Sequence, residues 1–252
     1  MLRPLRVRLR QGHRTMKFPK GAPPDLPERF RGRPLFDAEK CEPGCGDCRD
    51  GCPTGAITIE GKPALDLGRC LFCTDCLRAC SAGAISFTQE YRMATSRRED
   101  LVIDGSEFVL AAKLGEDLRK VLGRSLKLRH VSAGGCNGCE MDTNVLGTIG
   151  WDLGRFGIQL VASPRHADGL IVTGAVSANM HAALLKTYEA VAEPKIVIAV
   201  GACAISGGPF VGHEDVHDGV TNLLPVDLFV PGCPPHPLTI LDGLLRLIGV
   251  IE

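Results

Sequence analysis

The sequence predicts two kinds of fold in one chain: a cysteine-rich α+β region, then an α/β region built on a parallel sheet. Its 252 residues are enough for one or two domains. Twelve cysteines fall into three groups of four, and the first eight lie between Cys41 and Cys80. From Leu126 onward, short apolar runs bounded by Gly or Pro alternate with helical stretches. This alternation is typical of βαβ units around a parallel sheet.

Composition narrows the class of protein. Hydrophobic residues make up 44% and charged residues 23% of the chain, so a packed core is expected and wholesale disorder is excluded. The formal net charge is zero, which argues against nucleic acid as the main partner. Residues 1–40 nevertheless carry eleven basic and four acidic side chains, and we treat residues 1–35 as a basic N-terminal segment.

The first nineteen residues of this segment have the pattern of an interfacial segment. Leu2, Leu5 and Leu9 share one helical face and arginines occupy the rest, which predicts contact with a membrane surface or a membrane subunit. The alternative is a disordered basic tail, because Pro4 and Gly12 limit the helix. Neither a membrane-spanning run nor a secretory leader is expected, so the chain stays in a reducing compartment. Twelve cysteines there predict metal or cluster ligands rather than six disulfides.

Residues 36–90 contain an internal repeat. The segment Cys52–Thr58 recurs 28 residues later as Cys80–Ser86, and each copy continues into a short β-like run, Ala56–Glu60 or Ala84–Thr88. We therefore expect a duplicated half-domain, each half with a cysteine loop ahead of its run.

The spacing of the repeated cysteines predicts two [4Fe–4S] clusters. The last four of the eight match C-x2-C-x2-C-x3-C, in which one loop supplies three thiolates and the fourth cysteine binds the other cluster. The first quartet is Cys41, Cys45, Cys48 and Cys80, and the second quartet is Cys52, Cys70, Cys73 and Cys76. The first loop has one extra residue, which the Pro43-Gly44 turn can absorb, and Ser81 replaces the usual proline. Two zinc sites are the alternative, disfavoured because three cysteines crowd into Cys70–Cys76.

The rest of the chain divides into a connector and the α/β region. Over residues 91–125, four leucines at four-residue spacing predict a helical connector that packs on one face: Leu110, Leu114, Leu118 and Leu122. Residues 126–252 form the α/β region. Its expected strands are Leu126–Val131, Gly157–Val161, Leu170–Thr173, Ile196–Val200 and Val226–Val230. Its expected helices are Glu140–Leu153, Ala178–Ala192 and Leu238–Ile251.

Glycine-rich cysteine loops directly follow three of these strands. Ligands bind outside the carboxyl ends of the strands in such sheets, so four thiolates are expected to converge at one sheet edge. This third quartet is Cys136, Cys139, Cys203 and Cys233.

The cysteine repeat and its flanks resemble a known family. Phe30–Pro34, Leu67–Cys73 and Gln89–Tyr91 flank the clusters. With the cysteines they resemble the dicluster ferredoxin-like subunits of formate hydrogenlyase and hydrogenase complexes, and their relative in complex I. The resemblance implies a bacterial-ferredoxin-like 2[4Fe–4S] domain.

The α/β region resembles the small subunit of energy-converting, membrane-bound [NiFe] hydrogenases, which is homologous to the B subunit of complex I. The motifs are Gly135–Glu140, Ser163–Asp168, Thr173–Val176, Gly201–Gly208 and Pro231–Pro235. The resemblance implies a flavodoxin-like fold and a third [4Fe–4S] cluster, held by the third quartet and facing a large partner subunit. In the complex I branch the first two ligands are adjacent, whereas Asn137 and Gly138 separate them here, which favours the hydrogenase branch.

These resemblances imply an oxidoreductase subunit that relays electrons through three clusters and is catalytic only with a large [NiFe]-hydrogenase-like subunit. The expected partners also include membrane-arm subunits and a donor such as a formate dehydrogenase or ferredoxin subunit. The expected location is cytoplasmic, on the inner face of the cell membrane. A complex I-like quinone module and a free polyferredoxin are the alternatives.

Glu140 is the candidate catalytic residue. It follows a third-quartet cysteine and could relay protons between an active site and solvent. The alternative is a carboxylate stabilised by the helix dipole at a helix start. The pair His213 and His217 is a weaker metal candidate, because no third ligand is evident.

Overall fold

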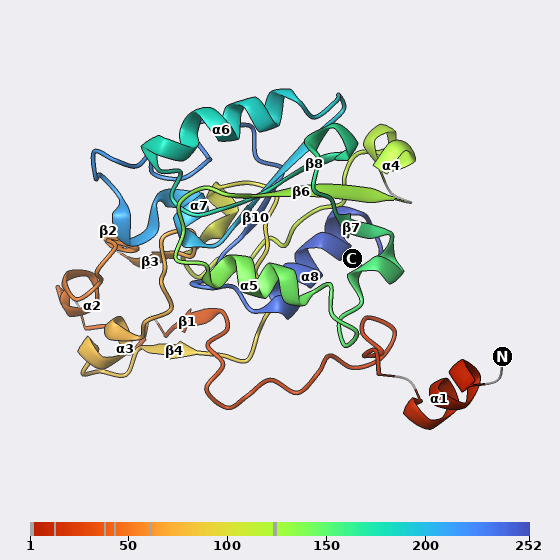
Figure 1. The fold of residues 1–252 in the computed structure, drawn as a ribbon. Helices are drawn as coiled ribbons and strands as arrows, with labels where there is room; N and C mark the ends of the chain where they lie inside the picture. Colours follow the sequence, from red (N-terminus) through yellow and green to blue (C-terminus); the bar gives the residue numbers. More distant parts are fainter. Residues whose placement is uncertain (1–2, 13, 38, 43, 61, 123–124) are drawn as a thin grey trace.

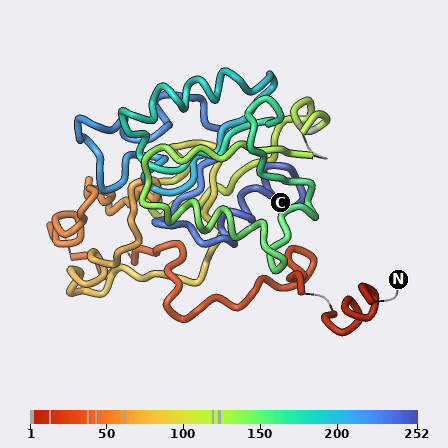
Figure 2. The backbone as a smooth tube through the Cα atoms, viewed as in Figure 1, coloured from red at the N-terminus to blue at the C-terminus, as the bar shows by residue number. Residues whose placement is uncertain are grey.

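The fold was analysed in a computed structural model, which describes residues 3–12, 14–37, 39–42, 44–60, 62–122 and 125–252. Figure 1 shows one helical and sheet-containing body, with the N-terminal stretch running along its edge to a separate helix. The tube in Figure 2 follows the same path.

A five-stranded parallel sheet organises the C-terminal half, as predicted. Its strands are β6 (Leu126–Ser132), β7 (Ile158–Leu160), β8 (Gly169–Thr173), β9 (Ile196–Val200) and β10 (Leu228–Val230). The order in space is β10-β9-β8-β6-β7, with every neighbouring pair parallel. Counted along the chain this is 2-1-3-4-5, the order of flavodoxin-like sheets. Every residue of β8 and β9 is buried, as expected for strands covered on both faces.

Helices cover both faces of this sheet (Figure 1). They are α5 (Gly138–Val145), α6 (Ala178–Glu189), α7 (Ala202–Ser206) and α8 (Pro237–Leu247). Neighbouring residues of β8 face opposite sides of the sheet. Val172 packs in the cluster that contains Leu184 of α6, whereas Ile171 packs in the cluster that contains Leu241 of α8. Helix α8 is buried along its whole length, and its Asp242 and Arg246 form an internal ion pair of 2.9 Å.

The cysteine-rich region contains the same short unit twice. Its elements are β1 (Pro34–Phe36), α2 (Asp47–Asp50), β2 (Ile57–Glu60), β3 (Lys62–Asp66), α3 (Asp75–Ala79) and β4 (Ile85–Phe87). Strand β1 pairs with β4 and β2 with β3, both antiparallel. The outer strands therefore pair with each other, as do the inner ones. The region is not isolated, because Ile57 and Leu65 belong to the hydrophobic cluster that also contains Val131 and Leu170 of the large sheet.

The prediction of a helix over residues 91–125 is wrong for most of that range. The chain forms a short 3-10 helix (Glu99–Leu101), then β5 (Val102–Ile103), which joins β3, and only later α4 (Glu116–Leu122). Leu110 and Leu114 lie ahead of α4, where the extended backbone bonds elsewhere: the Leu114 N–H donates to Leu247 O at 2.9 Å. Leu114 and Leu122 are nevertheless buried. The four-residue spacing of the leucines therefore does not come from one continuous helix.

The N-terminal segment starts with α1 (Arg3–Gln11), none of whose residues is buried. Leu5 and Leu9 are 59% and 82% exposed, while Leu2 lies outside the described residues. Further along, Phe18 is buried and the Arg155 guanidinium donates to its carbonyl at 2.6 Å. Within the described ranges, no helix has both the length and the hydropathy needed to cross a membrane.

Candidate metal centres

The third quartet lies at the carboxyl ends of the parallel strands. Its four cysteines line one cavity of about 350 Å³, together with Glu140, Thr173 and the glycines that follow the strands. Cys139 belongs to α5 and Cys203 to α7, and the loops after β6 and β10 supply the other two. The edge predicted for this quartet is therefore where the structure brings its members together.

The backbone around this cavity requires glycine at one position in particular. Gly201 joins β9 to α7 with a φ of +92°, and a Cβ added there would collide with the Cys139 sulfur. The left-handed backbone and the close approach of a thiol together explain the glycine.

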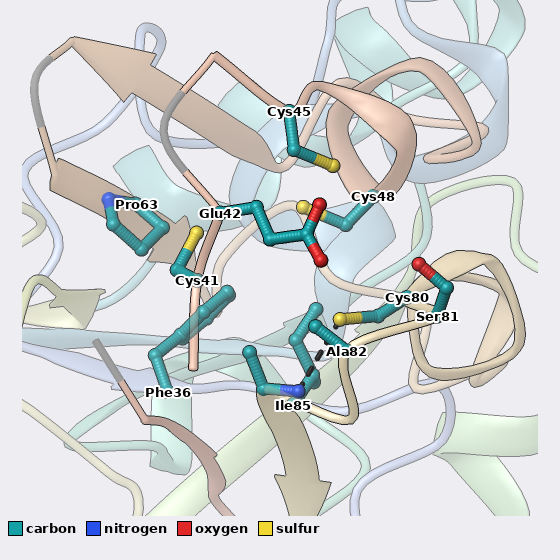
Figure 3. Close-up of a pocket in the computed structure, with 11 residues that line it drawn as sticks. Phe36, Cys41, Glu42, Cys45, Cys48, Pro63, Cys80, Ser81, Ala82 and Ile85 are labelled. Carbon is teal, nitrogen blue, oxygen red and sulfur yellow. Dashed lines mark hydrogen bonds between the residues drawn. The ribbon is translucent and has the colours of Figure 1, made fainter. Parts of the chain in front are cut away.

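The first quartet lines a second cavity, of about 410 Å³. Figure 3 shows its sulfurs directed toward a shared space, with Phe36 and Ile85 below them and the Glu42 side chain among them. The Ala84 N–H donates to Cys80 Sγ at 3.3 Å. Cys80 thus lines this cavity together with the three cysteines of the other half's loop.

The second quartet lines a third cavity, of about 300 Å³. Two backbone N–H groups point at its sulfurs, from Ala56 to Cys52 and from Phe72 to Cys70, both at 3.3 Å. Such hydrogen bonds stabilise negative charge on a sulfur. The bond from the Ala56 N–H to Cys52 corresponds to the bond from the Ala84 N–H to Cys80 in the other half. The sequence repeat therefore gives these two thiols the same backbone hydrogen bond.

Burial makes several of these thiols poor acids. It raises the pKa of Cys70 and Cys139 to about 12, and that of Cys76 and Cys203 to about 11. Neighbouring thiols raise these values further, because two adjacent thiolates repel. An uncharged protein interior would therefore keep these groups protonated, and a bound cation is needed to ionise them.

The donor sets fit an iron-sulfur cluster. Each quartet offers four sulfur donors around a cavity, and soft thiolates are the ligands such clusters use. In the part of the chain that the structure describes, no three His, Cys, Asp or Glu side chains converge closely enough to hold a single metal ion. The thiols thus surround a volume rather than a point. His213 and His217 do not take part in such a site among the described residues either. The His217 ring instead stacks on the His181 ring, with the two ring centroids 4.1 Å apart.

The first quartet adjoins the second, and the second adjoins the third. Cys48 of the first is close enough to raise the pKa of Cys76 in the second, after burial and the nearer thiols. Burial chiefly, then Cys136 and Cys73, raises the pKa of Cys233, so the second quartet adjoins the third. An open cavity of about 710 Å³ lies at this second junction, and we call it the junction cavity. Its lining includes Arg29, Arg31, Phe72, Asp142, Cys233 and His236.

Glu140 faces the third cavity and ends a chain of hydrogen bonds that the sequence did not indicate. Its carboxylate accepts from the Ser132 hydroxyl and from Thr173 Oγ1 at 3.4 Å. Thr173 also contacts His130 Nε2 at 3.1 Å. Burial chiefly, with Arg129, lowers the pKa of His130, although Glu140 acts against this. Ser132 and His130 are two residues apart on β6, so their side chains lie on the same face of the strand. This spacing is the only feature of the sequence that could have indicated the pair.

A thiol-lined α/β domain of this kind defines a subunit of a redox enzyme, and comparison with known proteins gives the family. Residues 136–247 match the family "NADH ubiquinone oxidoreductase, 20 Kd subunit". The probable membrane-bound hydrogenase subunit mbhJ of Pyrococcus furiosus is 44% identical over 128 residues, which is 51% of this chain and 77% of that protein. The chain belongs to this family of oxidoreductase subunits, as the resemblance implied.

Two further relatives match a smaller share of their own length. Formate hydrogenlyase subunit 7 of Escherichia coli is 41% identical over 141 residues, 56% of this chain and 55% of that protein. The B subunit of the NADH-quinone oxidoreductase of Carboxydothermus hydrogenoformans is 47% identical over 110 residues, 43% of this chain and 66% of that protein. The family thus includes subunits of hydrogenases and of quinone oxidoreductases.

Proposed function

We propose that this chain is an electron-transfer subunit that holds three [4Fe–4S] clusters, one in each quartet. The observation that carries the proposal is that the twelve cysteines line three separate cavities, four to each. When bound, each cluster would take up and release one electron at a time. The chain's own residues supply the thiolates, the N–H groups that stabilise them and the short separation between sites.

The domain organisation belongs to the same proposal. Residues 36–90 form a ferredoxin-like domain, supported by the duplicated unit and the pairing of β1 with β4 and β2 with β3. Residues 91–125 connect it to the domain of residues 126–252. Joining the two domains in one chain fixes their ratio at one to one and raises their effective concentration for each other.

The partner proposed for the third quartet is a large catalytic subunit of the [NiFe]-hydrogenase type. Cys136 lies in an exposed loop and Cys233 is exposed as well, so this quartet faces outward. The two residues between Cys136 and Cys139 favour the hydrogenase branch over the quinone branch. Glu140, at the rim of the same cavity, is a candidate to exchange a proton with that partner. A quinone-reducing complex is the second candidate, because a quinone oxidoreductase subunit is also a relative.

We place the chain on the inner face of the membrane, together with membrane-arm subunits and an electron donor such as a formate dehydrogenase or ferredoxin subunit. The support is the relative named as a membrane-bound hydrogenase subunit and the exposed, arginine-rich helix α1.

Iron and sulfide analysis tests the cofactor. Protein purified without oxygen should contain about twelve iron and about twelve sulfide per chain, since each of three cubes holds four of each. A folded preparation loaded with zinc and free of iron would refute the proposal. For the partner, two pairs of C-x2-C cysteines in the large subunit would indicate nickel, and their absence would favour the quinone branch.

A further inference from the structure

The two duplicated halves match in their cysteines but differ in charge. Residues 41–52 carry three acids and one base, whereas residues 70–80 carry one acid and one base. In each half the base is paired with an acid, as Arg49 with Asp50 and Arg78 with Asp75. The first loop therefore keeps two uncompensated acids, and the second keeps none.

One of the two acids reaches the thiols of the first quartet. Glu42 belongs to the loop that contains the extra residue, and its side chain lines the first cavity. Figure 3 shows its carboxyl group among the sulfurs of Cys41, Cys45, Cys48 and Cys80. The Glu42 carbonyl accepts from the Cys45 N–H at 3.1 Å, which closes the turn between these two ligands.

An arginine from outside the repeat reaches the second quartet. The Arg31 guanidinium donates to the Phe72 carbonyl at 2.7 Å. Phe72 lies between Cys70 and Cys73, is buried, and has a left-handed φ of +54°. Its own N–H donates to Cys70 Sγ. Arg31 therefore places a positive charge on the ligand loop and holds Phe72, the residue whose own N–H bonds a ligand sulfur.

Burial acts in the opposite direction from Arg31. Cys70 and Cys76 are buried in the second quartet, whereas Cys48 is the buried member of the first. Reduction adds negative charge to a site, and burial in a poorly polarisable surrounding disfavours that charge. Without Arg31 the second site would therefore be the harder one to reduce, and the arginine offsets this.

We propose that Glu42 lowers the reduction potential of the first site and Arg31 raises that of the second, so that electrons run downhill from the first quartet to the second. This inference rests on the proposed function, because it requires clusters in both quartets. Each site takes up one electron from a donor of lower potential. No bond forms or breaks and no proton moves. The direction of flow between these two sites is thus set by two side chains that the duplication does not share.

The test is a redox titration of the intact, cluster-loaded chain with dithionite, followed by EPR. Variants Cys45→Ser and Cys73→Ser assign the two signals. We expect a lower midpoint potential at the first site than at the second. Glu42→Gln should raise the potential of the first site alone, and Arg31→Gln should lower that of the second alone. Arg31→Lys keeps the charge and should stay closer to the wild type.

Two matched controls separate these effects from general surface charge. Glu39→Gln removes an exposed acid three residues from Glu42, and Lys113→Gln removes an exposed base of the connector. Both should leave the potentials unchanged. Fully loaded Glu42 and Arg31 variants with unmoved potentials would overturn the inference, as would equal shifts in the controls. Wild-type protein without iron at these sites would refute the proposed function, and the inference with it.

Discussion

The residues around the third quartet have two separate roles. Glycines let the backbone pass close to the thiols, as Gly201 does beside Cys139. Hydrogen-bonded side chains lead away from the thiols, from Glu140 through Thr173 to His130. Both features depend on residues far apart in the sequence, and each can be tested with one substitution.

Gly201→Ala should empty the third site. The new methyl group collides with the Cys139 sulfur, so we expect iron to fall from about twelve to about eight per chain, because one cube holds four, while the signals of the other two sites persist. Gly212→Ala is the matched control, since Gly212 also has a left-handed φ, of +77°, but no atom within 4 Å of an added Cβ. Both glycines have a positive φ, but Gly201 also has a ψ of 155°, a combination that is essentially confined to glycine, so backbone strain adds to the collision there. Equal iron loss in both variants would mean that a side chain at positive φ is enough to empty the site without the collision.

His130 should make the chain less stable in acid. Its folded pKa is lowered from the ordinary value of 6.5, so the unfolded chain binds the proton more tightly. Stability is therefore fully present above pH 6.5 and is lost as the pH falls toward the folded pKa, by at most about 1.4 kcal/mol per pH unit. Melting temperatures at pH 7.5 and 5.5 should differ less in His130→Gln than in the wild type. The exposed His166→Gln should behave like the wild type; a wild-type response in His130→Gln would contradict this.

At the scale of elements, what could be predicted depended on how local the signal is. Strands β8 and β9 were found because a buried strand is a short apolar run with turn residues beside it. The first two quartets were found because one loop supplies most of each ligand set. The connector failed because Leu114 bonds to Leu247, more than a hundred residues away, and no local pattern encodes that contact. The hydrogen bond from Arg31 to Phe72 was not expected for the same reason, because 41 residues separate the two.

Helix α1 should bind an anionic membrane surface. Its exposed leucines and its four arginines suit the boundary between headgroups and acyl chains. Deletion of residues 1–11 should lower flotation with vesicles that contain acidic lipid, and added salt should weaken wild-type binding. The deletion stops at Gln11 because Phe18 is buried and its loss would disturb the fold. Unchanged flotation after the deletion, or equal binding to neutral vesicles, would favour a solvated tail.

At the scale of the whole molecule, the two domains meet beside the ligands of adjacent quartets. Gly68 lies two residues before Cys70, and the Ser206 hydroxyl of α7 donates to its carbonyl at 2.8 Å. Cys203 belongs to the same helix. Nearby, Arg98 holds Asp66 through two hydrogen bonds of 2.8 and 2.6 Å. The contact of Ser206 with Gly68 brings the loop that leads into Cys70 next to the helix that contains Cys203.

Gly68→Val should therefore slow electron transfer between the second and third sites. An added Cβ at Gly68 would lie 2.8 Å from Ile205 Cγ2 and 2.9 Å from Arg98 Cζ, so the valine must displace the Ile205 side chain of α7 and the Arg98 guanidinium from the contact between the two domains. Electron transfer falls steeply with distance, so the third site should be reduced several-fold more slowly in rapid-freeze EPR, with iron content unchanged. Gly115→Ala, in the connector with open space around it, is the control and should transfer at the wild-type rate. A wild-type rate in Gly68→Val would show that the separation of these sites is set elsewhere, by the large partner subunit or by the hydrophobic cluster the two domains share.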